Sequence, residues 1–346
     1  RLDTVVFQEQ LGTVRAKTAR IEKLAERLSS EAGLAAQDAA DAVRAAHLCK
    51  ADLVTGAVVE FTSVQGIMGS YYAAAAGETD QVARAIADHY RPRFAGDDLP
   101  ESQVGKVVAM ADKLDTICGL FAVDQGPTGS SDPFALRRSA LGIIAILEAG
   151  LPVSLMDAID CALDSFEADG LSFDRDAVRD AVRDFFVTRT RVMLRDSGCE
   201  ADAIDAVLAV GVYEPAEILR RVRSLEDARK NARETFDDLA TAYARANNLR
   251  DAEQGVDFDE GSLSEVEQAL SCAVVQAETR VSFALEAGDF AAALQQLASL
   301  RKPIDLFFER VMVMDEDLAV RANRMKLLNR FVGVFQDVAD FGKMAR

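Results

Sequence analysis

Apolar residues recur along this chain at the spacing of an α-helix and not in strict alternation. Between residues 13 and 28, for example, Val14, Ile21, Leu24 and Leu28 repeat at steps that place them on one helical face. No segment shows the clean period of two that marks a half-buried β-strand. Apolar residues make up 49% of the chain and charged residues 28%, as in folded globular proteins. The sequence therefore predicts an all-α protein.

Length, hydropathy and cysteine usage narrow the class of protein. A chain of 346 residues predicts two or three domains. Its longest apolar run, near residues 139–147, is much shorter than the roughly 18 residues that cross a bilayer. The cysteines are odd in number and scattered through helical patterns, which is typical of reduced thiols. We expect a cytoplasmic protein with no disulfide, zinc site or membrane association. The start at Arg1, without methionine, indicates a piece of a longer chain.

The formal net charge of −18 argues against a general nucleic-acid binder and against DNA as a partner. Proteins of that class usually carry a basic surface. A specific RNA-binding protein can nevertheless be acidic overall if its cations are clustered. The distribution of arginine and lysine therefore matters more than their sum.

The stretch PTGSSDPFALRR, residues 127–138, combines a turn-rich loop with the expected start of a helix. Pro133 suits the first helical position, with Asp132 or the serine before it as the cap. Arg137 and Arg138 follow one turn later, and two interpretations of them stay open. They are either surface arginines on a capped helix, or they present guanidinium groups to phosphate beside the N–H groups of the helix start.

Seven strings occur in one order along the chain: EQLGT (9–13), KADLVT (50–55), QGIMGSYYA (65–73), ADHYRP (87–92), ADKLDT (111–116), PTGSSDPFALRR (127–138) and VMVMDEDLAVRANRMKLL (311–328). Together they resemble the β subunit family of the bacterial tetrameric glycyl-tRNA synthetase. The resemblance spans essentially the whole chain and depends on no single motif. One departure is Ser131, which stands where the family would have lysine.

The resemblance implies a division of labour between subunits. In this family the adenylation and transfer chemistry, with ATP and Mg, belongs to the α subunit, which assembles with the β subunit as two copies of each. This chain would bind and position glycine tRNA, with no catalytic residue and no cofactor of its own. The sequence also has no glycine-rich motif of the kind that cradles ATP phosphates.

Residues 1–126 resemble a degenerate HD-type helical domain. Hydrolases with that fold use histidine and aspartate side chains that converge on one or two metal ions. His47, Asp52 and Asp112 occupy candidate positions, but Ala51 stands where the His-Asp pair needs its histidine. We therefore expect no bound metal, with the aspartates as structural anchors. The alternative is a metal-dependent HD-type phosphohydrolase with an accessory helical domain.

Residues 127–214 are interpreted as a helical connector and residues 215–346 as a helical bundle. The strings YARANNL and LAVRANRMKLL in the bundle resemble the anticodon-binding domain of arginyl- and related tRNA synthetases. That likeness implies contact with the anticodon loop, whose bases are open to stacking and edge contacts. The candidate tRNA-binding residues are Arg137, Arg138, Arg220, Arg221, Arg321, Asn323, Lys326 and Arg330.

On the last predicted helix, Asn323, Lys326 and Arg330 project onto one stripe beside the apolar face. We expect this stripe to face the anticodon. Arg324 projects near the apolar seam, so we expect it to be a paired structural residue. Its expected partner is Asp305 or Glu309. The alternative for each arginine taken singly is a solvated, salt-bridged surface, and for the whole chain a helical scaffold with no RNA role.

Overall fold

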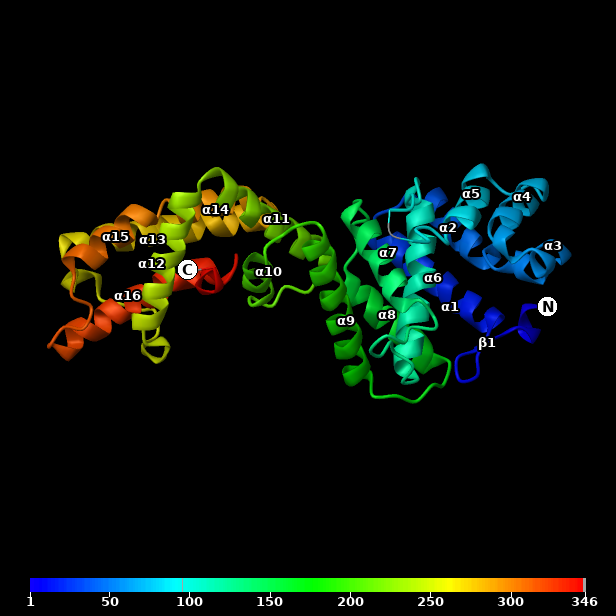
Figure 1. Ribbon diagram of the computed structural model, residues 1–346, viewed down its shortest axis with the longest axis horizontal. Helices are drawn as coiled ribbons and strands as arrows, with labels where there is room; N and C mark the ends of the chain where they lie inside the picture. Colours follow the sequence, from blue (N-terminus) through cyan, green and yellow to red (C-terminus); the bar gives the residue numbers. More distant parts are fainter. Residues whose placement is uncertain (95, 345–346) are drawn as a thin grey trace. The chain divides into compact units, whose positions relative to one another are not determined.

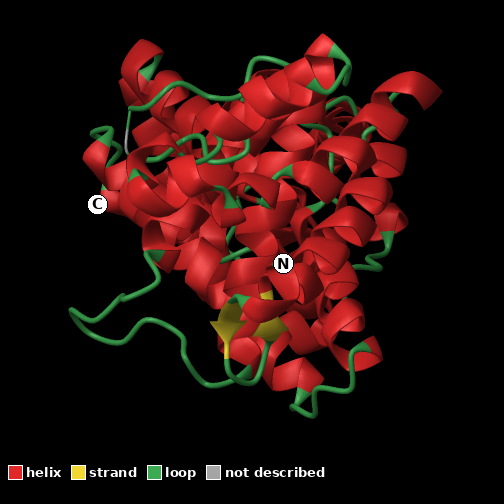
Figure 2. Cartoon of the chain, turned by 90° about the vertical axis from the view of Figure 1, so that its right-hand side faces the viewer, coloured by secondary structure: helices red, strands yellow, loops and turns green. Residues whose placement is uncertain are grey.

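Helices account for nearly all the regular structure in this computed structural model, which describes residues 1–94 and 96–344 (Figure 1). The predicted all-α class is confirmed, with one local exception. Strand β1 (Val6–Gln8) pairs antiparallel with β2 (Gly12–Thr13), which Figure 2 shows in yellow. Strands of three and two residues are too short to show an alternating pattern, so the sequence does not reveal this hairpin.

The chain forms two compact units. The N-terminal unit comprises residues 1–193 and 214–216, and the C-terminal unit comprises residues 194–213 and 217–346. The predicted connector, residues 127–214, contributes helices to both units. Among the described residues, no helix has the length and apolar character needed to cross a membrane.

One helix, α6 (Gln103–Ala122), forms the centre of the N-terminal unit, with 16 of its 20 residues buried. It begins at Ser102, whose side chain accepts a hydrogen bond from the Gly105 amide. The other helices of this unit are α1 (Val14–Glu31), α2 (Ala36–Leu48), α3 (Gly56–Glu60), α4 (Ile67–Ala75), α5 (Asp80–Asp88), α7 (Leu136–Glu148), α8 (Leu155–Ala168) and most of α9 (Arg175–Asp196). Helices α1, α2, α5, α7 and α8 pack against α6.

The sequence pattern predicts one helix over residues 36–53 and another over residues 54–76, and both are interrupted around Asp52. The helix predicted over residues 36–53 ends at Leu48 and is followed by the 3₁₀ helix η2 (Ala51–Val54). The helix predicted over residues 54–76 splits into α3 and α4, with the 3₁₀ helix η3 between them (Thr62–Val64). The Asp52 carboxylate accepts hydrogen bonds from the amides of Gly66 and Gly69 at 2.6 and 3.0 Å. This bonding holds a turn in place of a continuous helix, because side-chain bonds to the backbone compete with helical ones.

Helix α7 begins at Leu136, so the predicted start at Pro133 is wrong. The N-cap is Ala135 and not Asp132 or the serine before it, but the Asp132 side chain still binds the first amides of the helix. Its carboxylate oxygens accept hydrogen bonds from the amides of Leu136 and Arg137 at 2.8 and 3.0 Å. Ala135 has a left-handed φ of 55°, so the residues before Leu136 form a turn.

The C-terminal unit is a helical bundle with an aromatic core. The Phe335 ring lies 5.1 Å, between centroids, from each of the rings of Tyr243, Phe331 and Phe341. The helices of this unit are α10 (Ala201–Leu208), most of α11 (Pro215–Asn231), α12 (Arg233–Leu249), α13 (Glu265–Glu286), α14 (Phe290–Ala298), α15 (Arg301–Arg310) and α16 (Leu318–Gln336), with the 3₁₀ helices η4 (Ala252–Gln254), η5 (Glu260–Ser262) and η6 (Phe341–Lys343). Helix α16 packs against α12 and α13.

Local sequence signals in this unit are partly confirmed. Ser264 followed by Glu267 three residues later predicts a capping box in the sequence, and this box is present at the start of α13. The sequence also predicts a single helix over residues 216–246, which is wrong, because the helix is interrupted at Ala232 between α11 and α12. The backbone angles of Ala232, φ −143° and ψ 50°, are not helical.

Candidate functional site

The interior of the N-terminal unit contains a network of opposite charges around α6. Asp115 is 0% exposed and accepts hydrogen bonds from Lys17 Nζ at 3.0 Å and from Arg20 Nε at 2.6 Å. The guanidinium of Arg20 lies over the Phe166 ring, 4.4 Å from its centroid. A carboxylate on the apolar face of a helix needs such partners, because an unpaired buried charge is costly. Helix α1 supplies both of them.

Asp112, one turn earlier on α6, faces two lysines. Lys17 Nζ lies 3.0 Å from Asp112 Oδ1, and Lys50 Nζ lies 2.8 Å from Asp112 Oδ2. Lys50 Nζ also lies 2.9 Å from His89 Nε2, while His89 Nδ1 lies 2.7 Å from the carbonyl oxygen of Ile86. The imidazole of His89 is therefore neutral. Its Nδ1–H group donates a hydrogen bond to the carbonyl oxygen of Ile86, and Nε2 accepts a hydrogen bond from the ammonium group of Lys50.

The pKa values in this network follow from burial and from the partner charges. Burial acts to raise the pKa of Asp112, but Lys17 and Lys50 outweigh it and hold that pKa well below its usual range. Burial acts to lower the pKa of Lys50, and Asp112 outweighs it, so that the pKa of Lys50 is raised. Burial, followed by the charge of Lys50, lowers the pKa of His89 well below its ordinary value. Burial also lowers the pKa of Lys113, to about 8.

The three candidate positions of an HD-type metal site have separate environments. His47 Nδ1 lies 2.8 Å from Glu22 Oε1. Asp52 binds glycine amides, and Asp112 binds lysines. The histidine beside this cluster is His89, which the sequence candidates omit. Within residues 1–94 and 96–344, no group of three or more His, Cys, Asp or Glu side chains is placed to hold a metal ion.

A cleft of about 480 Å³ opens beside this network, within the N-terminal unit. Four segments line it: residues 62–65, 90–93, 112–116 and 134–139. The lining therefore includes Asp112 from α6 and Arg138 from α7. The fold thus brings the end of the PTGSSDPFALRR stretch next to the part of the chain that resembles an HD-type domain.

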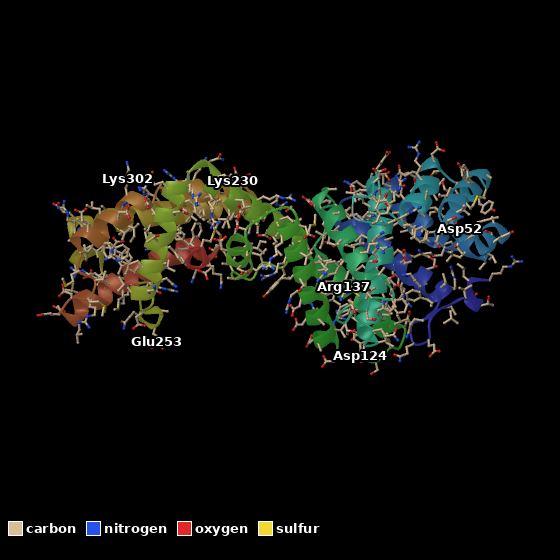
Figure 3. All side chains as sticks on the ribbon, in the orientation of Figure 1. Asp52, Asp124, Arg137, Lys230, Glu253 and Lys302 are labelled. Carbon is tan, nitrogen blue, oxygen red and sulfur yellow. The ribbon has the colours of Figure 1, made fainter. Side chains whose placement is uncertain are left out.

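The two arginines of that stretch occupy different positions. Arg137, labelled in Figure 3, donates a hydrogen bond from Nη2 to the Gly129 carbonyl at 2.6 Å. This bond links the start of α7 to the loop that precedes it. Arg138 lines the cleft and donates from Nη1 to the Arg93 carbonyl at 3.3 Å. The open question of phosphate binding therefore applies chiefly to Arg138.

In the C-terminal unit, much of the predicted stripe on α16 is engaged with protein groups. Asn323 Oδ1 accepts from the Asp259 amide at 2.7 Å, and Asn323 Nδ2 donates to the Asp259 carbonyl at 3.0 Å. Arg330 donates from Nε and Nη2 to the two carboxylate oxygens of Glu278, both at 2.7 Å. Lys326 is partly exposed. RNA contact at this stripe stays a prediction, and contact by Asn323 requires the exchange of these hydrogen bonds.

The remaining arginine candidates differ in exposure. Arg221 donates to the Val338 carbonyl at 3.1 Å, and its guanidinium lies 4.8 Å from the Phe290 ring centroid. Arg321 donates to the Asp315 carbonyl at 2.8 and 2.6 Å. Arg220 is exposed. Arg220 and Lys326 are therefore the candidates in this unit whose positions are most open to a ligand.

Arg324 is an ion-paired structural residue, as predicted, but its predicted partners Asp305 and Glu309 are wrong. Arg324 Nε lies 2.5 Å from Glu267 Oε1, and Nη1 lies 2.6 Å from Asp315 Oδ2. Projection of one helix cannot identify these partners, because Glu267 lies on α13, 57 residues earlier in the chain.

We expect Arg324→Ala to destabilise the C-terminal unit by about 3 kcal/mol. The change leaves the carboxylate of Glu267, which is 3% exposed, without its cation. Urea denaturation followed by circular dichroism measures the loss. The control is Arg310→Ala, since the Arg310 side chain is 64% exposed and pairs only with its equally exposed neighbour Glu309 among the described residues. A similar small loss in both variants would contradict a structural role for Arg324.

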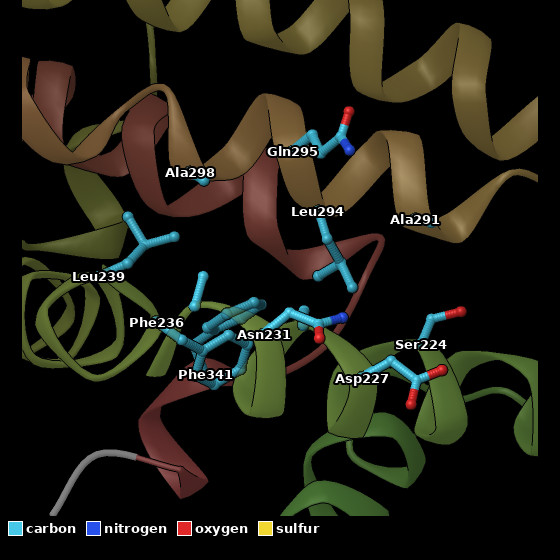
Figure 4. Close-up of a pocket in the computed structure, with 12 residues that line it drawn as sticks. Ser224, Asp227, Asn231, Phe236, Leu239, Ala291, Leu294, Gln295, Ala298 and Phe341 are labelled. Carbon is cyan, nitrogen blue, oxygen red and sulfur yellow. The ribbon is translucent and has the colours of Figure 1, made fainter. Parts of the chain in front are cut away.

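A second cavity, of about 290 Å³, lies within the C-terminal unit (Figure 4). Phe236, Leu239, Leu294 and Phe341 supply apolar lining, from α12, α14 and η6. Asp227 of α11 adds a carboxylate on another side, as Figure 4 shows. The lining suits an apolar group and provides no cation.

Two models of known protein families match this chain. The family model of the glycyl-tRNA synthetase beta subunit matches residues 1–209, and that of the DALR anticodon binding domain matches residues 239–340. The chain is 44% identical over 344 residues to the glycine–tRNA ligase beta subunits of Haemophilus influenzae (strain PittGG) and Actinobacillus pleuropneumoniae serotype 7. It is 42% identical over 349 residues to that of Moorella thermoacetica. These matches cover 98 to 99% of this chain and 49 to 50% of the relatives, so the chain spans about half the length of the curated relatives it matches. The chain belongs to the glycyl-tRNA synthetase β subunit family.

Proposed function

We propose that this chain is the tRNA-binding part of a glycine–tRNA ligase β subunit, and that its C-terminal unit recognises the anticodon of glycine tRNA. The observation that supports this most directly is the match of residues 239–340 to an anticodon binding domain, in a chain of the glycyl family. The bundle α12 to α16 supplies the matched residues. Unpaired anticodon bases are suited to stacking and edge recognition by such a module.

In this proposal the adenylation and transfer steps take place on the α subunit, which uses ATP and Mg. The β subunit positions glycine tRNA within an assembly of two α and two β subunits in the cytoplasm. None of the candidate residues in this chain is assigned a catalytic role. The chain alone would therefore bind tRNA without charging it.

The proposal predicts that this chain binds glycine tRNA more tightly than the same tRNA with a replaced anticodon. Lys326→Ala and Arg220→Ala should each weaken binding about fivefold, because each removes one cation from the RNA-facing surface. Each variant should also reduce the slope of log affinity against log salt by about one. Gel-shift titrations at several salt concentrations measure both quantities.

Lys23→Ala is the matched control, since Lys23 is exposed on α1 of the other unit. Its affinity for glycine tRNA should equal that of the unchanged chain. Binding that is indifferent to the anticodon, in the unchanged chain and in the variants alike, would refute the proposed recognition.

A further inference from the structure

The cleft of the N-terminal unit is lined by more cationic than anionic side chains, although the chain carries a net charge of −18. Three cations line it, namely Arg93, Lys113 and Arg138, against the single carboxylate of Asp112. Asp112 is already balanced, since it lies within 3.0 Å of two lysine ammonium groups. A cleft with this lining attracts anionic ligands and raises their local concentration.

The side chain of Arg138 reaches the backbone of Arg93 at this cleft. The hydrogen bond from Arg138 Nη1 to the Arg93 carbonyl ties α7 to the segment before residue 94. This bond uses one of the five N–H donors of the Arg138 guanidinium. Arg93 is exposed. Guanidinium groups are well matched to phosphate oxygens in charge and in geometry.

Aromatic rings and hydroxyl groups accompany these cations. Phe134 lines the cleft and is 37% exposed. Phe61 and Phe94 adjoin lining residues in sequence and are 60% and 59% exposed. The hydroxyl groups of Thr62 and Ser63 also line the cleft. Exposed aromatic side chains together with cations are the combination that many proteins use to bind single-stranded nucleic acids.

We propose that this cleft binds one unpaired nucleotide, with its base stacked on Phe134 and its phosphate held by Arg93 and Arg138. The phosphate group of a nucleotide would bind the two arginines, and its planar base would stack on the exposed Phe134 ring. Its ribose would form hydrogen bonds with the nearby hydroxyl groups. A volume of about 480 Å³ falls within the usual range of small-ligand sites. The nucleotide is either free or part of an RNA strand. This site goes beyond the proposed function, which places anticodon recognition in the C-terminal unit.

Fluorescence anisotropy with a labelled RNA tetranucleotide tests the site in the whole 346-residue chain. Phe134→Ala should weaken binding about tenfold, because base–aromatic stacking is lost. Arg138→Gln should weaken it about fivefold and reduce the salt slope by about one. Melting temperatures of the variants separate a loss of binding from a loss of folding.

Matched control variants change the same residue types away from the cleft. Phe283→Ala removes a phenylalanine that is 73% exposed on α13, and Arg84→Gln removes an exposed arginine on α5. Both should bind the tetranucleotide as the unchanged chain does. Equal losses in the controls and in the cleft variants, or no loss in either, would overturn the proposal.

Competition distinguishes the two sources of the nucleotide. Displacement by AMP at a concentration close to that of unlabelled tetranucleotide supports a site for a free nucleotide. Displacement by the tetranucleotide alone supports an RNA strand. Equal displacement by a blunt-ended RNA duplex would overturn the proposal, since a paired base cannot enter the cleft. These probes carry no anticodon loop, so the site is tested independently of anticodon recognition.

Discussion

Replacing Asp115 by alanine should cost the N-terminal unit about 3–5 kcal/mol of its free energy of unfolding. The carboxylate is fully buried and holds Lys17 and Arg20, which are 4% and 2% exposed. Without Asp115, the remaining carboxylates are Asp112 beside Lys17 and the half-exposed Asp169 beside Arg20. The variant therefore leaves excess positive charge in the interior, which is among the most costly changes available to a folded chain.

Hydrogen–deuterium exchange with mass spectrometry measures this change, because it reports on each unit separately. Peptides from α1 and α6 should lose protection, while peptides from α12 and α16 keep theirs. The control is Asp98→Ala, which removes an exposed carboxylate and should change stability by no more than about 0.5 kcal/mol. Equal protection in the two variants would show that the network adds little net stability.

Acidification should destabilise the N-terminal unit below about pH 6.5, the ordinary pKa of histidine. The unfolded chain binds a proton at His89 in this range, and the folded chain does not, because burial and Lys50 lower the pKa of His89. Stability from this group is therefore complete above pH 6.5 and is lost as the pH falls, with a slope approaching about 1.4 kcal/mol per pH unit. Asp112 adds a further loss below its ordinary pKa, since its folded pKa is depressed.

Urea midpoints measured between pH 7 and pH 5 test this dependence. His89→Gln should flatten the slope in that interval, even if it lowers stability at every pH. His47→Gln is the matched control, because His47 is the other histidine of the chain and its side chain is 39% exposed. A slope that persists in His89→Gln and disappears in His47→Gln would contradict the assignment.

Local patterns in the sequence predict the helices but not their partners. The capping box at Ser264 depends on residues a few positions apart and is confirmed. The need of Asp115 for a partner also follows from its place on an apolar face. Its partners, however, lie 95 or more residues earlier in the chain. No spacing rule within one helix identifies them.

The same limit applies to the candidate sites. His89 follows Val82 and Ile86 at steps of four and three residues, so helical projection of α5 identifies it as a buried residue. The projection does not reveal that Lys50 is its partner, 39 residues away. On α16 the projection places Asn323 on an accessible stripe, but it cannot show that residues 259–262 bind its amide. Contacts of this kind depend on the tertiary fold.

The cations that balance Asp112 have a consequence for how this unit depends on its surroundings. Both are side chains of the same polypeptide, Lys17 and Lys50, and so their supply does not vary with the composition of the medium. An interior that is balanced by a bound ion gains stability in proportion to the logarithm of the ion's concentration, and a chelator can withdraw that gain. A tethered ammonium group has no such concentration term. The positive charges that balance Asp112 are thus part of the chain itself, and the balance does not depend on the concentration of a free metal ion.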